Sequence, residues 1–148
     1  MLTAIKKFFT ENIAVDNSTD IEHQLKLATA ALMIEMMQQD DVAHEAEEDA
    51  VKQALQKKFS LADEETETLF TLAHAELKQS ADYYQFTSLI NQNFNPQQKY
   101  KVIEYLWEIA YADGHLDRYE EHMVRRIAEL IYVPHSDFIR AKHSAMPQ

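Results

Sequence analysis

The sequence predicts an all-α protein, a single-domain bundle of seven to eight helices, and three observations support this fold class. The 148 residues include one glycine and three prolines, which is too few turn residues for a sheet protein. Apolar residues recur at helical spacing along most of the chain, and no segment alternates apolar and polar residues as a half-buried strand does. A chain of this length can also bury a substantial core.

The first two predicted helices cover residues 2–11 and a long segment that ends near residue 39. Four apolar residues at helical spacing make the first helix amphipathic: Leu2, Ile5, Phe8 and Phe9. This helix packs on the bundle or docks on a partner or a membrane surface. The second helix follows a capping-box pattern, Thr19 with Glu22. It is apolar on nearly every side, which indicates a central, buried helix.

In the middle of the chain, the spacing of apolar residues predicts helices over residues 45–58 and 63–78. A shorter helix follows, and Asp82 with Gln85 caps its start. Each has apolar residues on one face, as expected for helices that surround a buried one.

Asn95-Pro96 is a strong start signal for the next helix, because asparagine caps well and proline suits the first turn. That helix reaches about residue 112. Another covers about residues 118–131, and a terminal helix opens at Pro134 or Ser136.

The sequence also contains an internal pseudo-repeat. Residues 35–59 align without a gap on residues 108–132, with an offset of 73. The identical pairs are Glu35 with Glu108, Asp40 with Asp113, Glu47-Glu48 with Glu120-Glu121, and Val51 with Val124, and the similar pairs include Met36 with Ile109, Lys52 with Arg125, and Phe59 with Tyr132. Each copy is an apolar run, an acidic turn and an acidic helix start. We therefore expect two similar helix–turn–helix units.

Charge and composition exclude several classes of protein. The formal net charge of −11 disfavours nucleic-acid binding, because the basic residues are scattered. The absence of cysteine excludes disulfides and thiolate chemistry. No stretch has the roughly 20 apolar residues of a membrane span, and the N-terminus lacks the pattern of a secretory signal. We expect a cytoplasmic protein whose partners are cations or basic protein surfaces.

The second acidic turn resembles the second half of a calcium-binding loop. In such a loop an Asp-Gly pair precedes a hydrophobic residue and a bidentate Glu, and Asp113, Gly114, Leu116 and Glu120 match this order. The first half of the loop fails, because Ile109 occupies a position that needs an acid. The chain is therefore not an EF-hand protein.

Two interpretations of the acidic turns stay open. In one, weak binding of Ca²⁺ or Mg²⁺ uses acids from both copies, and the candidate ligands are Asp113, Asp117, Glu120, Asp40 and Glu47. In the other, the turns are structural. Gly114 then ends a helix in the left-handed conformation, and Asp117 with Glu120 forms a capping box.

Other polar residues point to no catalytic site. The seven histidines show no zinc-ligand spacing, and nothing resembles a nucleophile elbow, a phosphate loop or a dinucleotide fingerprint. Glu108 lies on a polar helix stripe, which predicts a solvated carboxylate. Glu35 shares its helix face with small residues, and its carboxylate is either solvated or partly buried and directed at a turn.

One block of sequence resembles the TerB-like tellurite-resistance family. The block is Leu106-Trp107-Glu108-Ile109-Ala110-Tyr111-Ala112-Asp113-Gly114-His115-Leu116-Asp117, followed by Glu120-Glu121. The likeness covers roughly residues 25–145. The first turn departs from the family pattern, since Gln39-Asp40-Asp41 stands where Ala-Asp-Gly is usual.

The resemblance implies an all-helical, non-enzymatic cytoplasmic module linked to tellurite and stress resistance, with a domain over residues 19–148 and a preceding helix and linker over residues 1–18. It implies a protein partner, which in this family is thought to be membrane-associated, and no required cofactor. Two alternatives remain: a metal-dependent enzyme that uses the acids around an ion, and a peripheral-membrane adaptor that uses the N-terminal helix.

Overall fold

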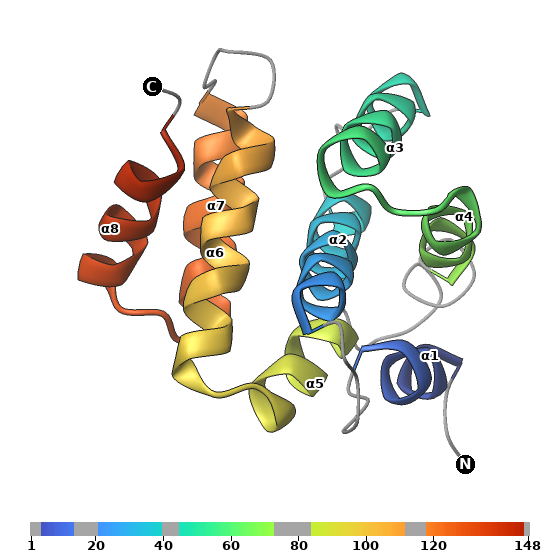
Figure 1. Ribbon diagram of the computed structural model, residues 1–148, viewed down its shortest axis with the longest axis horizontal. Coiled ribbons are helices and arrows are strands. Elements are labelled where there is room, and N and C mark those ends of the chain that lie inside the picture. The colour runs from blue at the N-terminus through green and yellow to red at the C-terminus, as the bar shows by residue number, and fades with distance from the viewer. Residues whose placement is uncertain (1–3, 14–20, 40–44, 73–83, 112–117, 147–148) are drawn as a thin grey trace.

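A computed structural model describes residues 4–13, 21–39, 45–72, 84–111 and 118–146, and only the backbone of residues 38, 39, 45–48 and 118–120. These ranges contain eight α-helices and no strand, which confirms the predicted fold class (Figure 1). In chain order they are α1 Ala4–Asn12, α2 Ile21–Gln39, α3 Glu45–Phe59, α4 Asp63–Leu72, α5 Gln85–Asn93, α6 Pro96–Ala110, α7 Arg118–Leu130 and α8 His135–Ala145.

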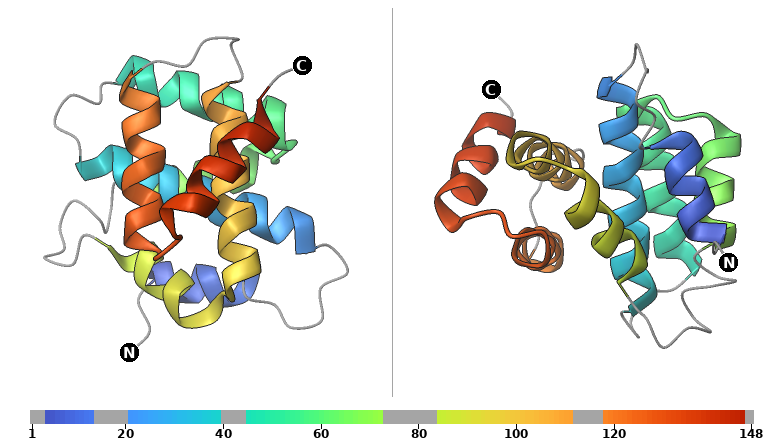
Figure 2. Two further views of the ribbon diagram at one scale, coloured as in Figure 1. Left: turned by 90° about the vertical axis from the view of Figure 1, so that its left-hand side faces the viewer. Right: turned by 90° about the horizontal axis from the view of Figure 1, so that it is seen from below.

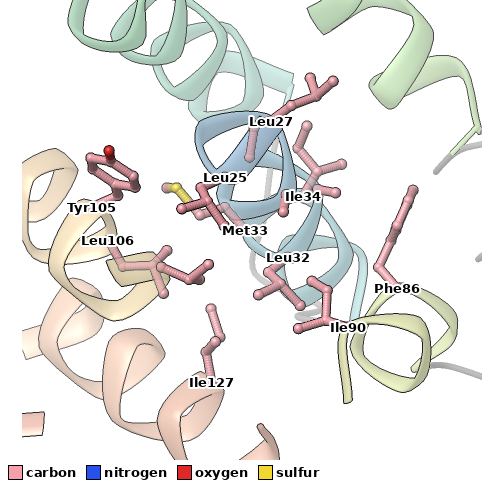
Figure 3. Close-up of a cluster of buried hydrophobic side chains, with 14 of the residues drawn as sticks. Leu25, Leu27, Leu32, Met33, Ile34, Phe86, Ile90, Tyr105, Leu106 and Ile127 are labelled. Atoms are coloured by element: carbon pink, nitrogen blue, oxygen red, sulfur yellow. The ribbon is translucent and has the colours of Figure 1, made fainter. Parts of the chain in front are cut away.

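Helix α2 is the centre of the core, as its apolar composition predicts. It runs across α6 (Figure 2), and side chains from α5, α6 and α7 close around it (Figure 3). Leu32 and Ile34 of α2 are 1% and 0% exposed, and their neighbours Ile90, Leu106 and Ile127 are equally buried. Burial on all sides explains why this helix has no polar face.

The pseudo-repeat extends over three helices in each unit, α2–α3–α4 and α6–α7–α8. Ser60 follows α3 with φ 57° and Tyr132 follows α7 with φ 63°, and these are the described non-glycine residues with positive φ. In each unit the next helix begins three residues later, at Asp63 or at His135. In both units, a residue in the left-handed conformation therefore stands at the equivalent position and turns the chain from the second helix into the third.

The burial pattern corrects the register of the repeat at its end. The ungapped alignment pairs Phe59 with Tyr132, but Phe59 is 2% exposed and Tyr132 is 78% exposed. Phe59 corresponds instead to Ile131, which is fully buried, and Ser60 corresponds to Tyr132. The offset thus shortens by one residue towards the ends of α3 and α7.

Helix α1 packs on the bundle, in agreement with one of the two alternatives for it. Its apolar stripe, Ile5, Phe9 and Ile13, is at most 2% exposed and joins the same core cluster as α2 and α6. The rings of Phe9 and Phe94, the residue that ends α5, lie 6.2 Å apart. The division between residues 1–18 and 19–148 stays a prediction.

Among the described helices, none combines the length and the hydropathy that crossing a bilayer requires.

Candidate functional site

The five candidate metal ligands fall at the two inter-helix turns. Asp40, Asp113 and Asp117 lie outside the described residues. Glu47 and Glu120 lie in the first turns of α3 and α7, but only their backbone positions are described. Elsewhere in the described ranges, no group of three or more His, Asp or Glu side chains could hold a metal ion. Metal binding by the turns therefore stays a prediction.

The helix that leads into the second turn is held firmly at both ends. At its start, the Asn95 side chain accepts a hydrogen bond from the Gln98 backbone N–H, and the Gln98 side chain accepts one from the Asn95 N–H. Near its end, the fully buried Trp107 indole donates to the Phe138 carbonyl oxygen at 3.2 Å. The Lys142 ammonium lies 5.3 Å from the Trp107 ring centroid. These contacts fix the position of α6 in the bundle from its first turn to Trp107.

Glu35, in the first unit, is a wholly buried carboxylate that caps another helix. Its oxygens accept hydrogen bonds from the backbone N–H groups of Phe86 at 2.6 Å and Thr87 at 3.2 Å, and from the Thr87 hydroxyl at 2.7 Å. Helix α5 has its N-cap at Tyr84, which makes no capping bond with its own side chain. Asp82, predicted to cap this helix, lies outside the described residues, and the cap falls two residues later than predicted, so Glu35 is the described group that satisfies the first turn of α5.

Glu108, the equivalent residue of the second unit, has a different environment. It is half-buried, and it makes no hydrogen bond or ion pair with the described residues. Burial raises the pKa of its carboxyl group, and the nearby Lys58 ammonium opposes that rise. The predicted solvation is therefore partial: the side chain stays partly exposed, while Lys58 of α3 and Lys26 of α2 lie near enough to act on its carboxylate.

Glu104, one turn earlier on α6, shows how a carboxylate here becomes satisfied. It receives hydrogen bonds from Lys101 at 2.7 Å and from the Ser144 hydroxyl at 2.6 Å. Burial raises the pKa of Glu104, but these hydrogen bonds outweigh that effect and leave the pKa below its usual value. Among the described residues at this end of α6, Glu108 is therefore the half-buried acid whose carboxylate oxygens accept no hydrogen bond from a described residue.

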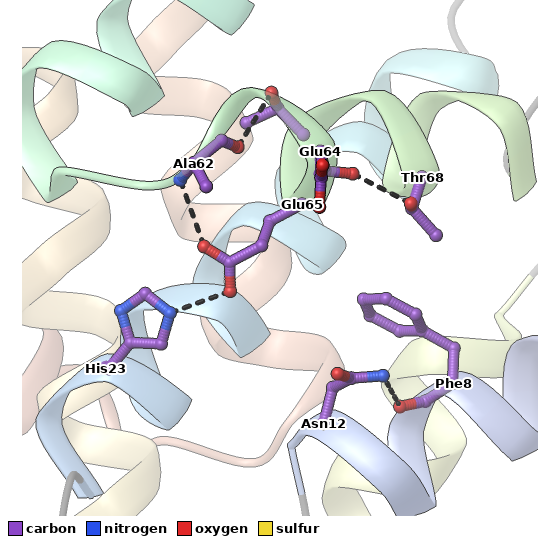
Figure 4. A network of polar contacts seen from close by, with 8 residues as sticks. Phe8, Asn12, His23, Ala62, Glu64, Glu65 and Thr68 are labelled. Atoms are coloured by element: carbon purple, nitrogen blue, oxygen red, sulfur yellow. Dashed lines mark hydrogen bonds and ion pairs between the residues drawn. The ribbon is translucent and has the colours of Figure 1, made fainter.

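A polar contact between α2 and α4 was not expected from the sequence. The His23 imidazole and the Glu65 carboxylate lie 2.7 Å apart, and Glu65 also accepts the Ala62 backbone N–H at 3.0 Å (Figure 4). Spacing along the chain could not show this pair, because the two residues are 42 positions apart. The contact ties α4 to the central helix and is therefore part of the framework of the bundle.

The chain was compared with protein families, curated proteins and solved structures. A family model described as "Tellurite resistance protein TerB" matches residues 26–143. This match covers most of the chain, from α2 into α8, and leaves α1 outside. No curated protein and no solved structure gives a match.

Proposed function

The chain belongs to the TerB tellurite-resistance family, and from this premise we propose that it is a non-enzymatic interaction module of the cytoplasm. It presents the acidic turns of its two units to a protein partner and binds a divalent cation, Ca²⁺ or Mg²⁺, weakly at the second turn. Its role in the cell is resistance to tellurite or related stress, exerted through that partner.

The observation that carries this proposal is the contrast between the two equivalent glutamates. In the first unit Glu35 is wholly buried and its acceptor capacity is used by Phe86 and Thr87. In the second unit Glu108 stands two residues before the end of α6, half-buried and without a described partner. Glu108 precedes Asp113 by five residues and Glu120 by twelve, and a further acid near these two supports binding at the second turn, because hard cations require several oxygen ligands.

The charge of the module supports a basic or cationic partner. The net charge is −11, and the first turn of α4 adds the exposed acids Asp63 and Glu64 to those of the turns. Such a surface attracts cationic groups over about one Debye length, roughly 8–10 Å in physiological salt. We therefore expect association with the partner to weaken as salt concentration rises.

Isothermal titration calorimetry on chelator-stripped protein tests the cation part of the proposal. We expect heat of binding for Ca²⁺ or Mg²⁺ at concentrations up to about millimolar, the range of weak extracellular-type calcium sites. The double variant Asp113→Asn with Glu120→Gln should lose this heat. Asp40→Asn with Glu47→Gln, which removes the same charges from the first turn, is the matched control and should keep most of it.

Two results would contradict the proposal. One is the absence of heat and of any change in melting temperature with either ion. The other is an equal loss of binding in both double variants, which would indicate a general effect of charge and no site at the second turn.

A further inference from the structure

Helix α1 covers an apolar surface that belongs to the rest of the bundle. Ile5, Phe9 and Ile13 are spaced by four residues, so they form one stripe along the helix, and each is at most 2% exposed. This stripe packs on α5, where Phe94 meets Phe9. Figures 1 and 2 show α1 alongside α5 and close to α4. Without α1, the apolar side chains of α5 beneath it would face water.

Two properties of α1 suit it to displacement from the bundle by a helix of another protein. It has nine residues, and a helix of this length is not stable without tertiary packing. It also lies outside residues 26–143, the part of the chain that the TerB family model matches. The stabilisation from three buried side chains is offset by the entropy lost in ordering the helix and its connection to α2. Such terminal elements open at a much lower free energy than the core does.

We propose that the surface of α5 beneath α1 is a helix-docking site, filled by α1 in the free protein and taken by a basic amphipathic helix of a partner protein. The site is formed by other residues than the acidic turns, and the proposal does not rest on their proposed function. By covering it, α1 acts as an internal competitor for the partner.

The chemistry of the occupant follows from α1 itself. The site accepts an aliphatic, an aromatic and an aliphatic side chain at positions i, i+4 and i+8, as Ile5, Phe9 and Ile13 provide. The outer face of α1 carries the exposed Lys6 and Lys7 near its start and the exposed Glu11 near its end, so two basic residues stand against one acid.

Nearby α4 supplies opposite charge. Its exposed first-turn acid Glu64 lies in the region that α1 faces, and Figure 4 shows Phe8 of α1 on the side towards this helix. A basic helix therefore fits the site better than an acidic one.

The test uses the full chain and a fluorescein-labelled synthetic peptide of residues 1–13, with binding followed by fluorescence anisotropy. The chain variant Phe9→Ala weakens the internal helix, while Thr10→Ala, which alters an exposed neighbour, is the matched control. We expect the peptide to bind Phe9→Ala at least about tenfold more tightly than the wild type or the control, because a competing internal helix lowers apparent affinity by the fraction of open sites.

Two altered peptides test the chemistry of the occupant. A peptide with Phe9→Ala should not bind. A peptide with Lys6→Glu and Lys7→Glu should bind more weakly, and that difference should shrink in high salt.

Equal peptide affinity for all three chains, or no binding to a Phe9→Ala chain that keeps its helical circular dichroism, would overturn the proposal. So would unfolding of the Phe9→Ala chain, since α1 would then be inseparable from the core. Hydrogen exchange on the unaltered protein is the independent measurement. Amides of α1 should exchange about 100-fold or more faster than those of α2 and α6, through local opening, and equal rates would contradict the proposal.

Discussion

Replacing Glu35 is the most informative single perturbation of this fold. The side chain is 0% exposed and accepts three hydrogen bonds, two from backbone N–H groups in the first turn of α5 and one from the Thr87 hydroxyl. In Glu35→Ala, all three donors lose this acceptor in a place that water does not reach. A buried donor without a partner costs about 1–3 kcal/mol, and the deleted side chain leaves a cavity.

We therefore expect Glu35→Ala to lower the free energy of unfolding by about 3–5 kcal/mol, a large part of the stability of a typical domain. Glu35→Gln keeps one acceptor oxygen but turns an amide N–H₂ towards N–H donors, so it should cost about 2 kcal/mol. Glu108→Gln is the matched control, since it makes the same change at the equivalent position of the second unit. It should change stability by less than about 0.5 kcal/mol, because the half-buried Glu108 carboxylate has no hydrogen-bond partner among the described residues to lose.

Urea denaturation at pH 7, followed by circular dichroism, measures these differences. Hydrogen exchange at the Phe86 and Thr87 amides should speed up in both Glu35 variants. Equal midpoints and slopes for Glu35→Gln and Glu108→Gln would show that the carboxylate of Glu35 contributes nothing as a cap.

The remaining predictions concern α6 and the turn after α7. The pKa of Glu108 is raised by burial, so its ionisation opposes folding and stability falls as pH rises through that pKa. Glu108→Gln should therefore raise the melting temperature slightly at pH 7, and the gain should vanish below about pH 4. The pKa of Glu104 lies below its usual value, so its stabilisation is present at neutral pH and lost as pH falls. Glu104→Gln should lower the melting temperature at pH 7, and equal pH profiles for the two variants would contradict this assignment. Tyr132→Gly should stabilise the protein by about 1 kcal/mol in urea denaturation, because φ 63° strains a residue with a side chain. Ser60→Gly is the parallel case, and destabilisation by both changes would argue against strain. Trp107→Phe should cost about 1–3 kcal/mol, since the Phe138 carbonyl loses its donor and the core loses volume. An unchanged urea midpoint would show that the indole N–H contributes nothing.

Local signals in the sequence were sufficient to locate most of the helices. The Asn95-Pro96 start is an example, because its capping box closes within four residues and depends on no distant contact. The apolar composition of α2 likewise predicted its central place, since a helix without a polar face must be covered on every side.

The environments of Glu35 and Glu108 depend on residues that lie far away in the chain, so the sequence did not predict them. The donors that Glu35 caps lie 51 and 52 residues away, so small neighbours on its helix face indicated burial but not the partner. Glu108 was predicted to be solvated because its own helix stripe is polar, whereas its burial comes from packing against other helices.

The register of the repeat illustrates a different limit. Phe59 and Tyr132 are both aromatic, so residue type favoured pairing them. Backbone conformation separates them, because Tyr132 occupies the left-handed position that Ser60 fills in the first unit. Residue likeness therefore placed the helices correctly but missed a one-residue difference at their ends.

The single glycine offers the most direct measurement of the central claim, that the second turn is the binding site. Because Gly114 is the only glycine in the chain, its amide gives an isolated signal in a ¹H–¹⁵N correlation spectrum. On addition of Ca²⁺ to about millimolar concentration, we expect this signal to shift or broaden in the wild type. In the Asp113→Asn, Glu120→Gln variant it should stay in place. A Gly114 signal that does not change with Ca²⁺ or Mg²⁺ in the wild type would contradict the account.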